Sequence, residues 1–246
     1  MSEKLLVIDG HSMAFRAFFA LPAESFTAAG GQHTNAVYGF LSMLVKLLDT
    51  EKPDRIAVAL DASRESFRTE IYPEYKGTRD SSPPEFEGQV QLIEAVLDKM
   101  GVKTITVPDF EADDVLATLA TEGKARGMDV LIASGDRDTF QLVNDKVTVL
   151  YPGRSTSDLN YMTPEAVEAK YAVTPARYPE LAALVGETSD NLPGIPGVGP
   201  KTAAQWLNKF DGLDSLLSRA DEVGGKRGEA LREHVEDVRR NRQLNA

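Results

Sequence analysis

The amino-acid sequence predicts an α/β fold, in which a mostly parallel central sheet is flanked by helices and followed by a helical C-terminal region. Over roughly the first 150 residues, short apolar runs rich in β-branched residues alternate with helical patterns. After residue 163 the pattern becomes helical, and a proline stands at the start of three successive segments. Strand–helix alternation is typical of parallel sheets because the crossover helices cover the faces of the sheet.

Four apolar runs predict the strands, and three helical patterns lie between them. We expect strands at residues 5–8, 56–60, 102–107 and 130–133. Helices are expected at residues 37–48, 90–100 and 112–126. Lys52-Pro53-Asp54, Gly101 and Gly127 follow these helices and are expected to end them, because proline and glycine commonly stand just after a helix.

Residues 62–88 interrupt this alternation. Basic and aromatic side chains are mixed there, namely Arg64, Arg68, Lys76 and Arg79 with Phe67, Tyr72, Tyr75 and Phe86. The pattern alone does not decide between a mobile, solvated connection and a functional insert.

The helical C-terminal region has three expected helix starts, Thr163-Pro164, Thr174-Pro175 and Gly199-Pro200. We therefore expect a core at residues 1–165, with an insert at about residues 62–88, and a helical region at residues 166–246. Residues 239–246 keep the helical pattern without a stop, which leaves open that the chain is truncated at its C-terminus.

The composition is that of an ordinary soluble globular protein, with 42% hydrophobic and 26% charged residues in a chain of 246. The absence of cysteine excludes disulfides, thiolate zinc sites and cysteine nucleophiles. The first apolar run ends at Asp9 and is too short for a signal peptide or a membrane span, so we expect a cytoplasmic protein without membrane contact.

Carboxylates follow the expected strands at the point where each strand ends. Asp9 and Asp61 follow the first two strands, Asp136 and Asp138 follow the fourth, and Glu111, Asp113 and Asp114 open the third helix. A single such acid is more often a turn residue or a helix cap. The joint pattern favours a site, because ligands of open parallel sheets bind beyond the carboxyl ends of the strands.

Such a cluster would repel itself without cations. Carboxylate oxygens without thiolates suit Mg²⁺ or Mn²⁺, and His11, His33 and His234 are too scattered to form a ligand set. No catalytic serine triad, Walker-type loop or dinucleotide motif is present. The pattern therefore favours phosphoryl chemistry with two or more metal ions.

A glycine-rich turn at residues 192–201 precedes the last expected helix start. Gly194, Gly197 and Gly199 permit a tight backbone whose amides point outward, and Lys201 adds a positive charge at a helix N-terminus. This is the pattern of a helix-hairpin-helix motif, which grips the backbone of a duplex without recognising its sequence. A plain turn between two helices is the alternative.

The net charge of −11 argues against a partner rich in phosphates. Nine carboxylates, the seven above with Glu187 and Asp190, would account for −9 of it and leave −2 for the rest of the chain. The objection is therefore weak, since bound divalent ions offset a cluster locally.

Several segments of the chain resemble the 5′-nuclease (flap endonuclease) family, and most closely the amino-terminal 5′–3′ exonuclease domains of bacterial DNA polymerases. The segments that carry the resemblance are residues 7–10, 34–40, 75–79, 111–114, 134–138 and 186–201. Together they are specific, and they cover nearly the whole chain.

The resemblance implies two groups of metal ligands. The first is Asp9, Asp61, Glu111, Asp113 and Asp114, and the second is Asp136, Asp138 and Asp190 with the position of Glu187. The resemblance also turns the insert into a helical arch through which a 5′ single strand passes. Lys76 and Arg79 would meet the scissile phosphate as catalytic residues, and Tyr75 would offer a stacking face to a base.

Further DNA contacts are implied at Thr34, Asn35, Tyr38, Tyr75, Gly194, Gly197, Gly199, Lys201 and Thr202. A K⁺ ion at the hairpin is a further implication. The expected protein is a monomeric, structure-specific 5′-nuclease that acts on DNA with a 5′ flap or 5′ end in replication and repair. A polymerase domain in the same chain is left open.

Two alternatives remain at this stage. The first is a branch-binding module that has lost catalysis, favoured by Glu187, where the family usually has aspartate. The second is an RNA-directed nuclease of related fold, which the acids do not exclude but which the hairpin disfavours.

Overall fold

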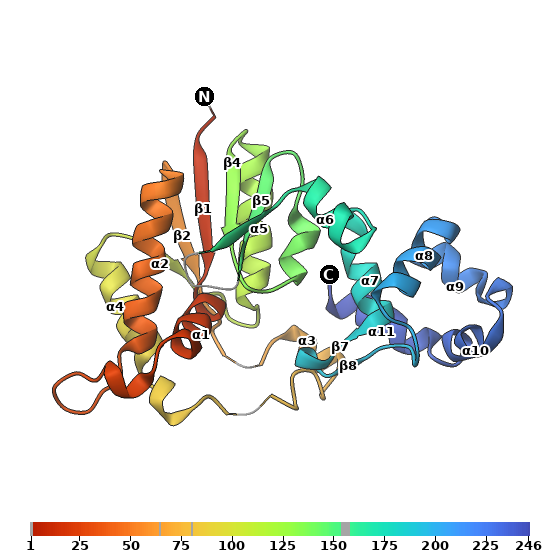
Figure 1. Ribbon diagram of the computed structural model, residues 1–246, viewed down its shortest axis with the longest axis horizontal. Coiled ribbons are helices and arrows are strands. Elements are labelled where there is room, and N and C mark those ends of the chain that lie inside the picture. The colour runs from red at the N-terminus through yellow and green to blue at the C-terminus, as the bar shows by residue number, and fades with distance from the viewer. Residues whose placement is uncertain (1, 64, 80, 154–157) are drawn as a thin grey trace. The chain divides into compact units, whose positions relative to one another are not determined.

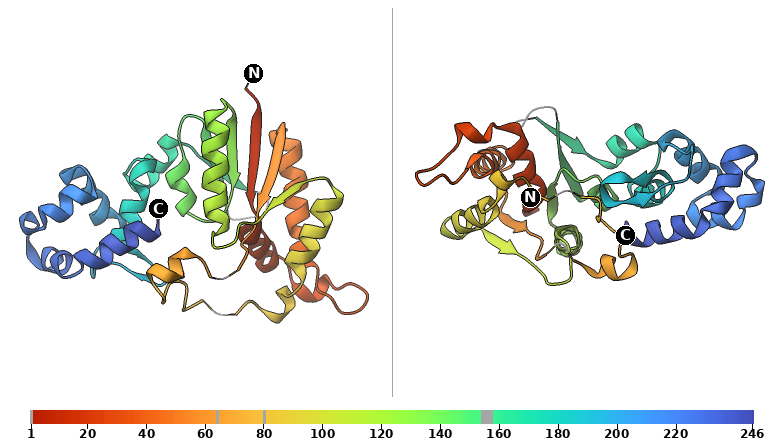
Figure 2. Two further views of the ribbon diagram at one scale, coloured as in Figure 1. Left: turned by 180° about the vertical axis from the view of Figure 1, so that it is seen from behind. Right: turned by 90° about the horizontal axis from the view of Figure 1, so that it is seen from below.

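The computed structural model describes residues 2–63, 65–79, 81–153 and 158–246. The chain divides into two compact units. The first consists of Met1–Ser66 and Ser81–Thr163, and the second of Phe67–Asp80 and Pro164–Ala246. Both are drawn in Figure 1 and, from two further directions, in Figure 2.

The first unit is built on a six-stranded sheet with the order β3-β2-β1-β4-β5-β6. The strands are β1 (Lys4–Asp9), β2 (Arg55–Ala59), β3 (Lys103–Ile105), β4 (Asp129–Ala133), β5 (Val147–Pro152) and β6 (Leu159–Met162). The first five are parallel, and β6 runs antiparallel to β5. The mostly parallel sheet is thus confirmed. β3 is shorter than expected because this edge strand pairs with β2 only as far as Ile105.

Helices cover both faces of this sheet. They are α1 (Gly10–Ala20), α2 (Asn35–Glu51), α4 (Gln89–Lys99) and α5 (Ala112–Ala125). Successive residues of a strand point to opposite faces. Leu6 and Ile8 of β1 accordingly join a buried cluster with α1, α2 and α4, whereas α5 lies on the other face, where its Gly123 approaches Leu5 and Val130.

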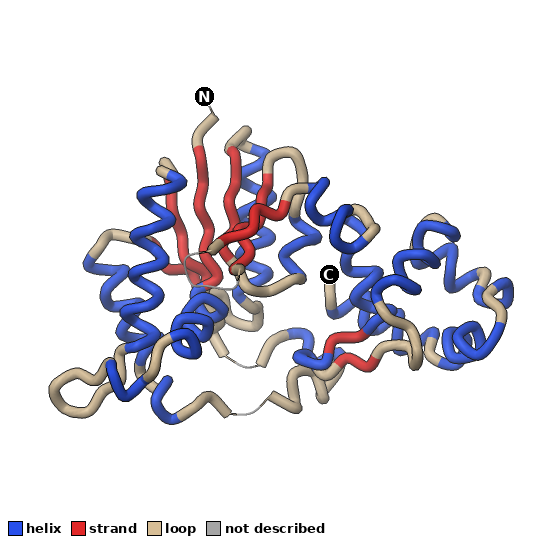
Figure 3. The backbone as a smooth tube through the Cα atoms, in the orientation of Figure 1, coloured by secondary structure: helices blue, strands red, loops and turns tan. Residues whose placement is uncertain are grey.

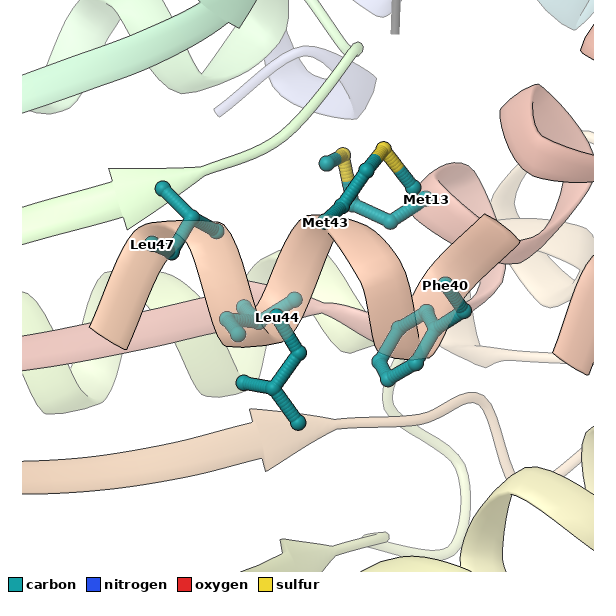
Figure 4. Close-up of a pocket in the computed structure, with 6 residues that line it drawn as sticks. Met13, Phe40, Met43, Leu44 and Leu47 are labelled. Carbon is teal, nitrogen blue, oxygen red and sulfur yellow. The ribbon is translucent and has the colours of Figure 1, made fainter. Parts of the chain in front are cut away.

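The buried side of α2 follows the apolar spacing expected from the sequence. Figure 4 shows Phe40, Met43, Leu44 and Leu47 of α2 beside Met13 of α1. All five are buried. The helix ends at Lys52, whose backbone is left-handed with φ 48°, and Gly101 and Gly127 follow α4 and α5 with φ of 73° and 77°. The stop positions expected from the sequence are therefore helix ends.

The order of the strands determines where a ligand would bind in the first unit. From β1 the chain moves outward to β2 and β3, and it then returns through α5 to β4 on the other side of β1. In open α/β sheets the crevice beyond the carboxyl ends of the strands, where the strand order reverses, is the usual binding site. Here that position lies between β1 and β4.

The second unit is helical. It contains α3 (Phe67–Ile71), α6 (Pro164–Tyr171), α7 (Tyr178–Val185), α8 (Pro200–Phe210), α9 (Leu213–Ser218), α10 (Gly225–Glu233), α11 (Val235–Leu244) and a hairpin of β7 (Gly186–Glu187) and β8 (Leu192–Pro193). Helices begin at Pro164 and Pro200 as expected. Pro175 instead begins a 3₁₀ turn, η4 (Pro175–Arg177), and α7 starts after it.

The insert differs from a solvated connection. Figure 3 shows residues 62–88 mostly as loop, and their described helices are α3 and the 3₁₀ turn η2 (Pro84–Phe86). Arg68 of α3 is buried, and its guanidinium donates to the carbonyls of Leu244 at 2.9 Å and Ala246 at 3.2 Å. Residues 67–80 therefore belong structurally with the C-terminal helix α11.

Within the described part of the chain, no helix is both long enough and apolar enough to cross a membrane.

Candidate active site

Asp9 is the centre of the carboxylate cluster in the first unit. It is the last residue of β1 and also the N-cap of α1, where its Oδ1 accepts the backbone N–H of Ser12 at 3.0 Å. Its Oδ2 accepts the hydroxyl of Ser134 at 2.7 Å. Only 5% of Asp9 is exposed. The carboxylate is therefore buried, with a donor on each oxygen.

The turn after β4 brings a second carboxylate to the same place. Ser134 accepts the backbone N–H of Asp136 at 2.9 Å, and Asp136 Oδ1 accepts the backbone N–H of Asp138 at 3.0 Å. Side-chain bonds to the backbone two residues away are typical of such turns. They give the turn a compact form at the carboxyl end of β4.

Asp61 and the start of α5 supply the remaining acids of this unit. Asp61 Oδ1 accepts the backbone N–H of Ala112 at 2.7 Å, so the end of β2 is bonded to the first residue of α5. Glu111 and Asp114 form a capping box at this helix start, in which the backbone N–H of Glu111 donates to Asp114 at 2.9 Å. Asp113 lies in the same turn. Helix capping thus explains the presence of Glu111 and Asp114 at this position, in line with the alternative that these acids are helix caps.

The electrostatics of Asp9 show which carboxylates lie close together. The pKa of Asp9 is raised to about 7, mainly by burial and also by the charges of Asp136 and Asp61, while the bonds from Ser134 and Ser12 oppose the shift. Asp136 and Asp61 thus both lie close enough to Asp9 to disfavour its charged form at the reversal point of the sheet. A donor set of carboxylate oxygens fits a hard divalent cation, and such a cation would relieve the repulsion.

The second unit holds the other two expected acids. Glu187 and Asp190 each have a carboxylate oxygen within 4.8 Å of the other. Asp190 is buried, and its Oδ2 accepts the hydroxyl of Tyr75 at 3.0 Å while its Oδ1 accepts Arg79 Nη2 at 2.6 Å. The backbone N–H of Lys76 donates to the carbonyl of Asp190 at 3.0 Å. Tyr75, Lys76 and Arg79 of the insert thus all form hydrogen bonds with Asp190, an expected metal ligand.

This arrangement adds a structural role to the one expected for Tyr75. Its side chain is 6% exposed and packs with Leu192 and Leu244. The phenol hydroxyl is directed to Asp190, which gives Tyr75 a structural partner, and a stacking contact to a base stays a prediction. Arg79 differs, since 47% of its side chain is exposed while it bonds to Asp190.

The glycine turn before α8 has the tight form that its sequence predicts. The backbone N–H of Val198 donates to the carbonyl of Ile195 at 3.0 Å, and Gly197 between them has φ 75°. A Cβ on Gly194 would lie 1.9 Å from the carbonyl oxygen of Val185. Glycine is therefore required at both positions, for conformation at one and for space at the other.

The end of this turn faces solvent. Gly199 is the exposed N-cap of α8, with an extended backbone that other residues could adopt, and Lys201 is exposed in the first turn. Thr202 is half-buried beside it. Among the residues that the structure describes, the amides of Gly197 and Gly199 show no hydrogen-bond partner. The arrangement can accept an anion at the start of α8.

The DNA contacts expected near α2 fall into two kinds. Asn35 is fully buried, and its amide donates to the carbonyls of Phe18 and Leu21, both at 2.9 Å. Its side chain therefore supports the start of α2, and a DNA contact at Asn35 stays a prediction. Thr34 is half-buried, and its hydroxyl donates to a carbonyl in the preceding loop at 3.2 Å. Tyr38 is 57% exposed.

Sequence reasoning missed the two serines that bond to Asp9. Ser134 stands in a segment that carried the resemblance, and Ser12 follows Asp9 by three residues. Local spacing does not show that the Ser134 hydroxyl meets Asp9, because the two residues are 125 positions apart. Ser12 bonds to Asp9 through its backbone N–H and not through its hydroxyl. His11 was also set aside, and its Nδ1 lies 3.3 Å from Asp61 Oδ2.

A mostly parallel sheet has the buried Asp9 at the end of β1 and the half-buried Asp136 after β4, and the helical unit has a turn that can accept an anion. This combination is typical of metal-dependent nucleases. The family model described as "5′-3′ exonuclease, N-terminal resolvase-like domain" matches residues 4–172, and that described as "5′-3′ exonuclease, C-terminal SAM fold" matches residues 173–246. The chain belongs to the 5′–3′ exonuclease family.

The curated relatives agree with this assignment. The chain is 54% identical over 240 residues to DNA polymerase I of Mycobacterium tuberculosis, covering 98% of this chain and 26% of the relative. It is 43% identical over 237 residues to DNA polymerase I of Bacillus subtilis, covering 96% and 26%. The chain thus spans about a quarter of the length of these curated relatives.

Two solved structures share the fold. The flap endonuclease D15 of bacteriophage T5, in a pseudo-enzyme-product complex with DNA and metal ions, superimposes with a TM-score of 0.78 at 23% identity, covering 98% of this chain and 88% of that one. The catalytic core of Rad2 in complex with a DNA substrate gives a TM-score of 0.58 at 19% identity, covering 96% and 73%.

We predict that the metal-free protein loses stability as the pH rises, and that Asp9→Asn removes part of this loss. The folded pKa of Asp9 is about 7 and its ordinary value is 3.8, so the folded state holds a proton that the unfolded state releases. Stability therefore falls between these values as the pH rises, by up to a few kcal/mol. The advantage of the variant over the native protein should grow from pH 5 to pH 8.

Denaturant unfolding in excess chelator measures this difference. Asp49→Asn, a substitution of an exposed aspartate on α2, is the matched control. A difference between Asp9→Asn and the native protein that stays constant across this pH range would contradict the prediction.

Proposed function

We propose that this chain is a structure-specific 5′-nuclease, a 5′ flap endonuclease and 5′–3′ exonuclease that acts on DNA in replication and repair. It hydrolyses a phosphodiester near the junction of a 5′ flap or at a recessed 5′ end, leaving a 5′-phosphate and a 3′-hydroxyl. The observation that carries the proposal is the buried Asp9, held between Ser12 and Ser134 and repelled by Asp136 and Asp61 at the reversal point of the sheet.

The proposed cofactors are two or more Mg²⁺ or Mn²⁺ ions. The candidate ligands in the first unit are Asp9, Asp61, Glu111, Asp113, Asp114, Asp136 and Asp138, and those in the second unit are Glu187 and Asp190. When bound, the ions would activate water and stabilise the leaving oxygen. The protein's own part is to hold the carboxylates in place, and the Asp9 carboxyl would release its proton to the solvent as a cation binds.

Lys76 and Arg79 are the proposed contacts to the scissile phosphate. The guanidinium of Arg79 has five N–H donors in a planar fork, so it can keep its bond to Asp190 and still offer donors to a phosphate. The positive charges would stabilise the charge that develops on the phosphate in the transition state. Arg79 would then connect the phosphate with a candidate metal ligand directly.

The glycine turn before α8 is the proposed binding site for the duplex. The exposed amides of Gly197 and Gly199 and the side chains of Lys201 and Thr202 would meet a backbone phosphate, with a K⁺ ion as a proposed bridge. Tyr38 is the proposed contact near α2. A polymerase domain in the same chain, a monomeric state and a cytoplasmic location remain expectations of the same proposal.

A branch-binding module without catalysis is the second candidate, and Glu187 is the observation that favours it. Glutamate keeps the charge of aspartate but adds a methylene, so its carboxylate reaches a metal from a different backbone position or through a water. Mg²⁺ demands near-octahedral geometry and tolerates such displacement poorly. The two candidates differ in whether the native protein cuts.

Asp136→Asn should lower single-turnover cleavage of a labelled 5′-flap duplex by about 100-fold or more. Loss of a residue that only orients a metal ligand typically lowers activity by about 10–100-fold, and loss of a ligand itself should cost at least as much. The amide oxygen can still accept the backbone N–H of Asp138, so the turn should persist while the charge is lost. Affinity for the duplex in Ca²⁺ should stay within about threefold.

The control is Asp145→Asn, the same change at an exposed aspartate before β5, on the opposite edge of the sheet. Full cleavage by Asp136→Asn, or cleavage by the native protein in excess chelator, would overturn the metal-dependent mechanism.

Lys201→Ala should weaken binding of duplexes similarly for all sequences and should lower the slope of log affinity against log salt by about one. The physical reason is the loss of one phosphate contact at the start of α8. Fluorescence anisotropy across salt concentrations measures the slope. Lys209→Ala, near the end of the same helix, is the matched control, and equal slopes for Lys201→Ala and the native protein would remove this lysine from the interface.

Glu187→Asp should cleave the flap duplex at a lower Mg²⁺ concentration than the native protein does. The shorter side chain suits the family pattern, and a better-placed carboxylate should bind the ion more tightly. A Mg²⁺ titration of cleavage compares the half-saturation points of the two proteins. Superimposable curves would show that residue 187 does not affect a metal site, and activity gained only by the variant would favour the branch-binding module.

A further inference from the structure

Ser134 connects two candidate metal ligands through a single oxygen atom. The residue follows β4 directly and is fully buried. Its hydroxyl donates to Asp9 Oδ2 at 2.7 Å and accepts the backbone N–H of Asp136 at 2.9 Å. A serine hydroxyl has one donor, so the donor of Ser134 is committed to Asp9.

Ser12 of α1 likewise forms one hydrogen bond with Asp9 and one with the turn after β4. Its backbone N–H donates to Asp9 Oδ1 at 3.0 Å, and its hydroxyl accepts the backbone N–H of Gly135 at 3.0 Å. A Cβ on Gly135 would lie 2.9 Å from the Ser12 hydroxyl, so a larger residue at this position would displace that hydroxyl. The two serines thus join the start of α1 to the turn after β4.

The consequence for Asp9 is a defined orientation. Each of its carboxylate oxygens accepts one donor, from opposite sides, and this fixes the plane of the group. A carboxylate oxygen has a second lone pair, which remains for a cation. A buried carboxylate that lost one of these donors could rotate about its last bond, and the second lone pair would no longer have a fixed direction.

We propose that Ser134 is a positioning residue for metal binding: its hydroxyl holds the Asp9 carboxylate in the orientation that binds a divalent cation and keeps it in register with the Asp136 turn. The inference rests on the proposed function for the role of Asp9 and Asp136 as ligands. Groups that orient a ligand from behind typically change metal affinity by about 10–100-fold when removed.

The test uses the full chain and Mn²⁺ alone as the probe. Ser134→Ala removes the hydroxyl, and Ser134→Cys replaces it by a larger sulfur with a much weaker donor. Calorimetric titration should give a dissociation constant for Mn²⁺ about 10-fold higher in both variants than in the native protein. Circular dichroism and thermal unfolding in chelator establish that each variant is folded.

The matched control is Thr139→Val. Thr139 is also buried, and its hydroxyl donates to the backbone carbonyl of Asp136 at 2.6 Å, so it supports the same turn without touching a carboxylate. Its Mn²⁺ affinity should stay within about twofold of the native value. If Thr139→Val loses as much affinity as Ser134→Ala, support of the turn explains the effect and the positioning role is wrong.

Native Mn²⁺ affinity in folded Ser134→Ala and Ser134→Cys would also overturn the inference. A cleavage assay adds an independent check, since Ser134→Ala should need more Mg²⁺ for half-maximal cleavage yet approach the native rate at saturation. Failure of the proposed function has a different outcome: the native protein would not cut a flap duplex at any Mg²⁺ concentration, while the dependence of Mn²⁺ binding on Ser134 would persist.

Discussion

The first unit depends on one electrostatic constraint, the burial of the Asp9 carboxylate at the edge of the sheet where the parallel strands end. Burial is the largest cost of its charge, and the neighbouring charges of Asp136 and Asp61 add to that cost. Hydrogen bonds from Ser12 and Ser134 offset only part of the cost. A buried charge that destabilises the metal-free protein is typical of a cation-binding site, because functional sites are often arranged at the expense of stability.

The second unit depends on a different contact, the attachment of the insert to Asp190. Tyr75 and Arg79 bond to its carboxylate, and the backbone of Lys76 bonds to its carbonyl. The proposed phosphate contacts and a candidate metal ligand are consequently parts of one bonded network. A change at Tyr75 would therefore alter the position of Asp190 as well as any contact to DNA, so effects on binding and on catalysis need not separate cleanly at that residue.

Several elements of the fold could be predicted because their causes are local. The apolar spacing of α2 and the glycines after α4 and α5 act within a few residues, and the structure has helices that end where expected. The strands β5 and β6 were not predicted, and the direction of β6 is set by its antiparallel pairing with β5, which is a tertiary contact. Asn35 shows the same limit for side-chain contacts, since its burial and its bonds to the carbonyls of Phe18 and Leu21 depend on how α1 packs against α2.

The sequence by itself determined the periodicity of the strands and helices, the identity and spacing of the acids, and the glycine turn before α8, because each is a property of neighbouring residues. Only the tertiary structure decided which groups meet these acids. Ser134 and Asp9 are 125 residues apart, and Tyr75 and Asp190 are 115 apart. The first pair meets because β4 lies beside β1, a strand order set by the return of the chain through α5. The second pair meets because residues 67–80 belong to the helical second unit, although the residues before and after them in the sequence belong to the first unit.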